Sequence, residues 1–180
     1  KQIRMWSAAC SSGQEPYTLA MILKEEAAKM AGWKVEIVAT DLSTEILSKA
    51  KEGLYSQFEV QRGLPITLLM KYFAQEGEKW RISDEISKMV TYKPFNLLDN
   101  PAALGTFDVV FCRNVLIYFD QQTKGQVLGR IAQIMPSDGF LYLGGAETVL
   151  GISDSFEVVP GQRGIYRLTG GDANMDRKAG

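Results

Sequence analysis

The chain has 180 residues, 20 of them lysine or arginine and 21 aspartate or glutamate, and it contains no histidine. The missing histidine excludes a Ser-His-Asp triad, a Cys-His pair and an HExxH zinc helix, and two cysteines alone cannot hold a structural zinc. The net charge of −1 argues against nucleic acid as the main partner, and no apolar run is long enough to insert into a membrane.

The first residue and the two cysteines indicate what kind of chain this is. Because the sequence begins with Lys1 rather than methionine, we expect a fragment of a longer protein. Cys10 and Cys112 lie in apolar, strand-like segments, which favours two buried free thiols over a disulfide. We therefore expect a protein of the reducing cytoplasm. We also expect a monomer without a metal site.

Strand-like and helix-like patterns alternate along the chain. The first half predicts a strand at 3–8, a helix opened by Pro16 and ending near Gly32, a strand at 35–40, and a helix from a Ser43 cap to Gly53. The second half predicts a helix at 123–135 and strands at 107–112, 140–143, 156–159 and 164–168. Such β-α-β repeats indicate an α/β fold, with helices on both faces of a mostly parallel sheet and an antiparallel edge hairpin.

One stretch interrupts this alternation. Residues 64–73 resemble a helix opened by Pro65, and residues 79–95 resemble a β-hairpin around a polar turn at Asp84 and Glu85. We interpret residues 73–95, approximately, as a small β-subdomain inserted into a single domain at 1–169. The small, polar residues 170–180 predict a disordered tail.

Ligands of open α/β sheets bind at the carboxyl ends of the strands, so the segments after the strands are the candidate site. After the first strand, Ala8 and Ala9 allow a ligand to approach the backbone, but Gly13 is the only glycine where a dinucleotide fingerprint needs three. Glu15, at the start of the next helix, would repel a pyrophosphate and attract a cationic ligand. The alternative is a tight turn in which Glu15 only complements the helix dipole.

Two later strands end in polar residues. Asp41 follows the second strand, where a carboxylate commonly accepts the two hydroxyls of a ribose, and the alternative is a turn or capping aspartate. Asn96 follows the third strand of the main sheet, where its amide could read an adenine edge, and a turn-forming role is equally compatible with the sequence.

The segment Cys112 to Phe119, CRNVLIYF, follows the fourth strand. Arg113 leaves the sheet where a ligand should lie, and Tyr118 could direct its hydroxyl at a reacting centre. The alternative is an apolar connection with Tyr118 in the core. Together, a ribose acid, an adenine-reading amide and a carboxylate in place of a phosphate cradle indicate S-adenosylmethionine rather than a dinucleotide.

The sequence also resembles a known family, the chemoreceptor methyltransferases, CheR. The resemblance covers roughly residues 4–168 and rests on five runs in the family's order, namely WSAACSSGQEPY, ATD, NLL, FDVVFCRNVLIYF and DGFLYLGGAE. It implies a Rossmann-like class I methyltransferase fold, with a β-subdomain before the third sheet strand. It also implies methyl transfer from S-adenosylmethionine to glutamate carboxylates on the cytoplasmic coiled coil of chemoreceptors, giving methyl esters and S-adenosylhomocysteine.

By position, the resemblance implies a set of site residues. Arg113 and Tyr118 would lie at the reacting centre, and the cofactor would be bound by Ala8, Ala9, Glu15, Asp41, Asn96, Leu97, Cys112 and Arg113. The family's upstream helical domain and its linker are absent here, which predicts weak activity in this chain alone. The stretch 74–81 is short and has one glycine, which argues against docking on a receptor's C-terminal pentapeptide.

The lack of histidine suits this chemistry, because a glutamate with a pKa of about 4.3 is already ionised at pH 7 and needs no general base. The alternative function is a cofactor-binding or regulatory module with little catalysis. A nicotinamide dehydrogenase is disfavoured, because the chain lacks the glycine fingerprint, a Tyr-x-x-x-Lys pair and a histidine acid.

Overall fold

The computed structural model describes residues 1–171, in two compact units. The first unit comprises residues 1–2 and 10–95, and the second comprises residues 3–9 and 96 onward. Most of the tail that the sequence predicts to be disordered, residues 172–180, lies outside the described residues.

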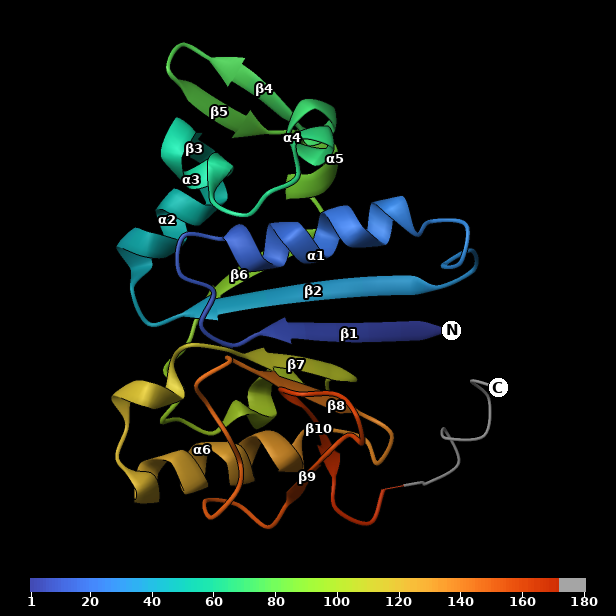
Figure 1. The fold of residues 1–180 in the computed structure, drawn as a ribbon, viewed down its shortest axis with the longest axis vertical. Helices are drawn as coiled ribbons and strands as arrows, with labels where there is room; N and C mark the ends of the chain where they lie inside the picture. The colour runs from blue at the N-terminus through green and yellow to red at the C-terminus, as the bar shows by residue number, and fades with distance from the viewer. Residues whose placement is uncertain (172–180) are drawn as a thin grey trace. The chain divides into compact units, whose positions relative to one another are not determined.

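The first unit contains two groups of strands and most of the helices (Figure 1). Strands β2 and β6 pair in parallel with Asp41 opposite Pro94, and strands β3, β5 and β4 form a separate antiparallel sheet. In chain order, its elements are α1 (Gln14–Glu25), β2 (Lys34–Asp41), α2 (Thr44–Glu52), β3 (Leu54–Ser56), α3 (Gln57–Gln61), α4 (Ile66–Tyr72), β4 (Phe73–Glu76), β5 (Lys79–Ile82), α5 (Asp84–Ser87) and β6 (Val90–Pro94).

The second unit is built on five strands in the order β1-β7-β8-β10-β9. The pairs β1·β7 and β7·β8 are parallel, whereas β10 pairs antiparallel with both β8 and β9. Its elements are β1 (Gln2–Ser7), η1 (Pro101–Leu104), β7 (Val109–Cys112), η2 (Leu116–Tyr118), α6 (Gln121–Gln133), β8 (Phe140–Leu143), β9 (Phe156–Val158) and β10 (Ile165–Leu168).

Local sequence signals explain where several helices begin and end. The Ser43 hydroxyl accepts a hydrogen bond from the Ile46 N–H at the start of α2, and Gly53 ends that helix with a φ of 62°. Asp120 caps α6 in the same way, by accepting from the Thr123 N–H. These caps satisfy backbone N–H groups that have no partner inside the helix.

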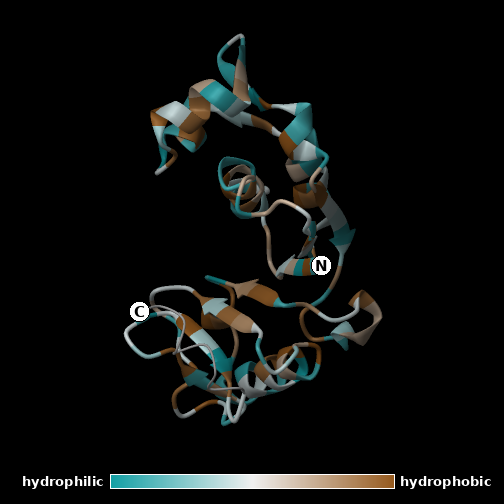
Figure 2. Cartoon of the chain, turned by 90° about the vertical axis from the view of Figure 1, so that its right-hand side faces the viewer, coloured by the Kyte–Doolittle hydropathy of each residue, from teal (hydrophilic) through white to brown (hydrophobic). Residues whose placement is uncertain are grey.

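Each unit has its own buried aromatic residues. In the second unit, the rings of Trp6 and Phe107 stack at 5.5 Å, and neither side chain is exposed. The strands around them carry hydrophobic stretches, drawn brown in Figure 2. In the first unit, Tyr17 packs edge-to-face against both Tyr55 and Tyr92. Burying aromatic rings of this size contributes strongly to the stability of a domain core.

The predicted α/β class with mostly parallel strands is confirmed, and so is the antiparallel hairpin of β9 and β10. The details of the inserted subdomain were wrong. Its hairpin turns at Gly77 and Glu78 rather than at Asp84 and Glu85, which instead begin helix α5. Its sheet also includes β3, and residues 90–94 pair with β2 of the main sheet.

The first helix is also shorter than predicted. It ends at Glu25, and the residues up to Gly32 form turns. The Glu26 N–H donates to the Ile22 carbonyl at 3.0 Å, and the Ala27 N–H makes a tighter turn onto the Lys24 carbonyl at 3.3 Å. Among residues 1–171, no helix combines the length and apolar character that crossing a membrane requires.

Candidate functional site

In the first unit, Asp41 ends strand β2 and binds two neighbouring backbone groups. One carboxylate oxygen accepts a hydrogen bond from the Ser11 N–H at 2.9 Å, and the other accepts from the Ser43 N–H at 3.0 Å. A carboxylate offers about four lone-pair positions, so each oxygen keeps one for a ligand. Asp41 therefore forms the turn that the sequence left as an alternative, and it can still accept two ribose hydroxyls.

The loop that contains Ser11 is bound by one aromatic hydroxyl and packs against another. The Tyr55 hydroxyl donates to the Ser12 carbonyl at 2.7 Å. Gly13 has a φ of 93°, and a Cβ there would lie 2.8 Å from the Tyr92 hydroxyl oxygen. Only glycine fits this position, because both the backbone conformation and the space exclude a side chain.

Cys10 and Glu15 lie at the two ends of this loop. The Cys10 N–H donates to the Thr40 carbonyl at 2.9 Å, and its side chain is buried. Burial, with the nearby Asp41 charge, raises the pKa of the Cys10 thiol to about 12, so it is neutral at pH 7. Glu15 is half-buried in the first turn of α1, whose N-cap, Gly13, makes no side-chain hydrogen bond.

In the second unit, strands β1 and β7 end side by side. The Ala8 N–H donates to the Phe111 carbonyl at 2.8 Å, so the pairing continues one residue beyond β1. Ala8 and Cys112 are buried, and Cys112 is a free thiol like Cys10, as the sequence predicted. Ala9 is half-buried. The ends of β1 and β7 therefore carry only small side chains at these three positions.

The turn that follows β7 is organised by one carboxylate, that of Glu147. One of its oxygens accepts from the N–H groups of Asn114 and Gly144, both at 2.7 Å. The other accepts from Val115 at 2.9 Å, from Leu116 at 2.8 Å and, more weakly, from Ile117 at 3.4 Å. Glu147 thus satisfies five backbone donors that neither strand nor helix pairs.

This turn contains a strained residue and a close backbone approach. Asn114 has a φ of 56°, a left-handed conformation that is uncommon outside glycine. A Cβ on Gly144 would lie 2.5 Å from the Asn114 side-chain oxygen, so the Gly144 backbone approaches the turn more closely than any other residue type allows. The Glu147 hydrogen bonds provide the stabilisation that a strained turn needs.

Arg113 and Tyr118 lie on either side of this turn. Arg113 directly follows β7 and is exposed, and Tyr118 ends the short helix η2 with 78% of its side chain exposed. A core position for Tyr118 is therefore wrong. Its hydroxyl is accessible, and its assignment to the reacting centre stays a prediction.

Asn96 and Leu97 lie where the chain enters the second unit again, directly after the first unit ends at residue 95. The Asn96 side-chain oxygen accepts from the Leu98 N–H at 3.0 Å, which is the turn-forming role that the sequence left open. Its side-chain nitrogen remains available to donate to a base edge. Leu97 is buried, with 9% exposure.

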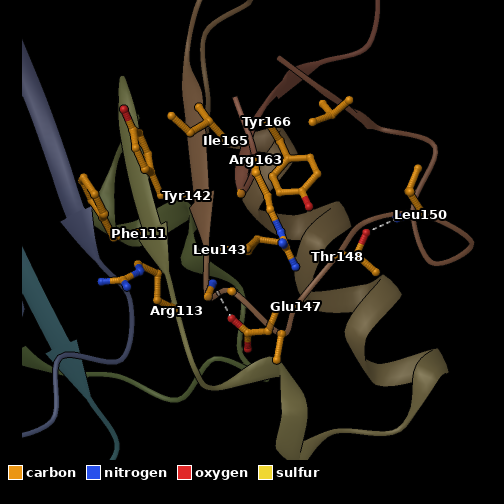
Figure 3. A pocket seen from close by; sticks show the side chains of 15 residues that line it. Phe111, Arg113, Tyr142, Leu143, Glu147, Thr148, Leu150, Arg163, Ile165 and Tyr166 are labelled. Carbon is orange, nitrogen blue, oxygen red and sulfur yellow. Dashed lines mark hydrogen bonds between the residues drawn. The ribbon is translucent and has the colours of Figure 1, made fainter. Parts of the chain in front are cut away.

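A pocket of about 880 Å³ opens at the carboxyl ends of β7 and β8 (Figure 3). Arg113 and Glu147 line it from the β7 and β8 sides, and Arg163 and Tyr166 line it from the hairpin of β9 and β10. Sequence reasoning missed both Glu147 and Arg163. Glu147 lies in the run DGFLYLGGAE, two residues after a Gly-Gly pair. That pair was the one local signal of a polar turn at this position.

Comparison with known proteins places the chain in a family. Residues 1–165 match the CheR methyltransferase, SAM binding domain. The chain belongs to this family. Its cofactor is S-adenosylmethionine, as the sequence predicted.

Named relatives agree with the family match. Chemotaxis protein methyltransferase Cher2 of Pseudomonas putida is 44% identical over 169 residues, which is 92% of this chain and 62% of that protein. The chemotaxis protein methyltransferase of Escherichia coli is 40% identical over 153 residues, 81% of this chain and 52% of that protein. The chain thus spans less than two thirds of the length of these curated relatives.

A solved structure shows the same fold. The TehB-like SAM-dependent methyltransferase of Corynebacterium glutamicum aligns with a TM-score of 0.52 at 14% identity, over 92% of this chain and 78% of that one. The predicted class I methyltransferase fold is therefore confirmed.

Proposed function

We propose that this chain is the catalytic domain of an enzyme that methylates glutamate side chains on chemoreceptors, with S-adenosylmethionine as the donor. The observation that carries the proposal is the membership of the CheR methyltransferase family over residues 1–165, joined to an Asp41 carboxylate with both oxygens able to accept a ribose hydroxyl. The names of the relatives support chemotaxis as the process.

The chemistry asks little of the side chains. An oxygen of the ionised glutamate forms a bond to the methyl carbon, and the carbon–sulfur bond breaks with its electron pair passing to sulfur. The bound cofactor supplies a methyl group on a positively charged sulfur, so the leaving group departs neutral. No proton moves, which suits a chain of 180 residues without histidine. The protein's contribution is to position the carboxylate and remove part of its water.

The residues divide between cofactor and acceptor. Asp41 would hold the ribose, Glu15 would face the cationic amino-acid end, and Asn96 with Leu97 would contact the adenine. Ala8, Ala9 and Cys112 would leave room for the cofactor beside the backbone. Arg113 would orient the acceptor carboxylate rather than clamp it, because a tight ion pair would stabilise the ground state and slow the transfer. Tyr118 would present its exposed hydroxyl to the same centre.

The proposed acceptor is the cytoplasmic coiled coil of a chemoreceptor, which would place the reaction in the cytoplasm. We propose that the enzyme acts there as a monomer. We propose no docking on a receptor's C-terminal pentapeptide, because the turn of the β4–β5 hairpin comprises only Gly77 and Glu78. A longer loop would be needed to hold a peptide there.

The first test replaces the ribose-binding carboxylate. Asp41→Asn keeps the shape of the side chain but loses the charge, and we expect S-adenosylhomocysteine to bind about 100-fold more weakly, since two hydrogen bonds to a charged group are weakened. Isothermal titration calorimetry measures this directly. Asp138→Asn, at an exposed turn before β8, is the matched control and should bind as the parent does. An Asp41→Asn affinity within twofold of the parent would refute the ribose assignment.

The second test asks for catalysis. The native protein that contains this chain should transfer radiolabelled methyl groups to a receptor cytoplasmic fragment as esters that release methanol in mild alkali. Binding of S-adenosylhomocysteine without any base-labile label would instead support the alternative, a cofactor-binding module without catalysis. This chain spans 62% of the length of its Pseudomonas putida relative. The alternative therefore concerns the 180-residue chain when it is assayed alone.

A further inference from the structure

We infer that the pocket at the ends of β7 and β8 binds the acceptor polypeptide through an acidic segment, with Arg163 as a specificity-determining cation. The inference rests on the proposed function and adds to it the surface that selects the substrate. It concerns the second unit alone, because every residue that lines this pocket belongs to that unit.

The pocket lies where an acceptor must arrive. It opens beyond the carboxyl ends of two parallel strands, which is where α/β sheets bind ligands. Its volume of about 880 Å³ exceeds what one side chain fills, so it accommodates a target side chain together with its neighbours. Arg113 lies at one side of the pocket and Leu150 at the other, with Arg163 between them (Figure 3).

Arg163 carries a charge that the fold leaves available. It stands in the exposed turn between β9 and β10, and Figure 3 shows its side chain reaching toward the segment of Glu147 and Thr148. Within residues 1–171 it makes neither a hydrogen bond nor an ion pair. An arginine held at the rim of a pocket without a partner suits recognition of a carboxylate, which its planar guanidinium binds in bidentate fashion.

The neighbouring charges do not neutralise Arg163. The Glu147 carboxylate is directed at five backbone N–H groups of the turn after β7. Glu157 on β9 forms an ion pair with Arg167 at 2.8 Å. The charged residues that line the pocket are Arg113, Arg163 and Glu147, so the net charge of its lining is positive, which is complementary to an acidic segment.

The outer rim of the pocket is apolar. Leu150 is 74% exposed and Val158 is 47% exposed, and both line the pocket. A surface with two arginines and two exposed aliphatic side chains suits a polypeptide that mixes acidic and apolar residues, such as one amphipathic helix of a coiled coil. It does not suit nucleic acid, which requires several cations along a backbone.

The test is the kinetics of methyl transfer by the native protein to a receptor cytoplasmic fragment. We expect Arg163→Gln to raise KM for the fragment about tenfold while kcat stays within twofold, because the lost ion pair forms in the ground state and the transition state alike. Arg163→Lys should recover part of the loss, and Arg163→Glu should raise KM further. The dependence of kcat/KM on salt should also become shallower in Arg163→Gln.

Lys51→Gln is the matched control, since it removes one positive charge from an exposed position at the end of α2 in the first unit. It should leave KM unchanged. An Arg163→Gln enzyme with the KM and salt dependence of the parent would overturn the inference, and so would a KM that rises equally in Lys51→Gln. If the parent itself transfers no methyl group to the fragment, the proposed function fails instead, and calorimetry with S-adenosylhomocysteine shows whether the cofactor still binds.

Discussion

Two loops, one in each unit, are held in place by different means. In the first unit, the loop from Cys10 to Glu15 rests on separate contacts, including the Asp41 carboxylate and the Tyr55 hydroxyl. In the second unit, the turn from Arg113 to Ile117 depends on the single carboxylate of Glu147. Both arrangements supply hydrogen-bond partners to backbone groups that follow a strand and have no partner within a strand or helix.

The difference is one of redundancy. Loss of one contact in the first loop leaves the others in place, because they come from two strands, with Thr40 and Asp41 on β2 and Tyr55 on β3. Loss of Glu147 leaves several N–H donors of one turn without an acceptor at the same time, next to a left-handed Asn114. The second unit should therefore be far more sensitive to one substitution than the first.

The largest effect is expected from Glu147→Ala. It removes a charged acceptor from five backbone N–H groups, and we expect the free energy of unfolding to fall by about 3 kcal/mol and methyl transfer to fall at least 100-fold. Glu147→Gln keeps one acceptor oxygen, so its free energy of unfolding should fall by about half as much as that of Glu147→Ala. Urea denaturation and the receptor methylation assay measure the two quantities.

Glu78→Ala provides the control, because Glu78 is an exposed glutamate in the β4–β5 turn and its loss should change stability by less than about 0.5 kcal/mol. If Glu147→Ala were as stable and as active as Glu78→Ala, the turn after β7 would not depend on this carboxylate, and the contrast between the two loops would disappear.

A smaller effect, on the first unit, is expected at alkaline pH. Burial raises the pKa of the Cys10 thiol to about 12, from 9.0 in an unfolded chain, and it also raises the pKa of Tyr17, Tyr55 and Tyr92. The folded state then retains protons that the unfolded state releases, so stability is complete below pH 9 and is lost as the pH rises toward 12. Between pH 8 and pH 10.5, Cys10 alone should cost about 2 kcal/mol of unfolding free energy.

Urea denaturation at the two pH values measures this loss, and Cys10→Ala separates the thiol from the tyrosines. The variant should lose less stability than the parent over the same pH range. Equal losses in the two proteins would show that the Cys10 thiol titrates normally in the folded chain.

The sequence predicted well what depends on local pattern. The Ser43 cap, the Gly53 helix end and the strand before Asp41 follow from residue types within a few positions, and the structure confirms them. It predicted poorly what depends on distant pairing. The polar pair Asp84 and Glu85 suits a hairpin turn and a helix start equally, and only the pairing of β6 with β2 decides between them.

The same distinction applies to the site. Asp41 is recognisable because it directly follows a β-branched strand. Glu147 acts on a turn 30 or more residues earlier in the chain, and Tyr55 acts on a carbonyl 43 residues away. No local pattern connects such partners, so their roles emerge only when the strands are assembled.

The smallest effect is expected from Tyr55→Phe, which tests whether the first loop is as redundant as its separate contacts suggest. The change removes one hydrogen bond, from the Tyr55 hydroxyl to the Ser12 carbonyl, and keeps the ring that packs against Tyr17 and Phe73. We expect unfolding free energy to fall by about 1 kcal/mol and S-adenosylhomocysteine to bind only a few-fold more weakly, since Asp41 still holds the Ser11 N–H. Calorimetry and urea denaturation check both values. A loss of affinity as large as that of Asp41→Asn would mean that the loop rests mainly on Tyr55, and that both units depend on a single distant side chain.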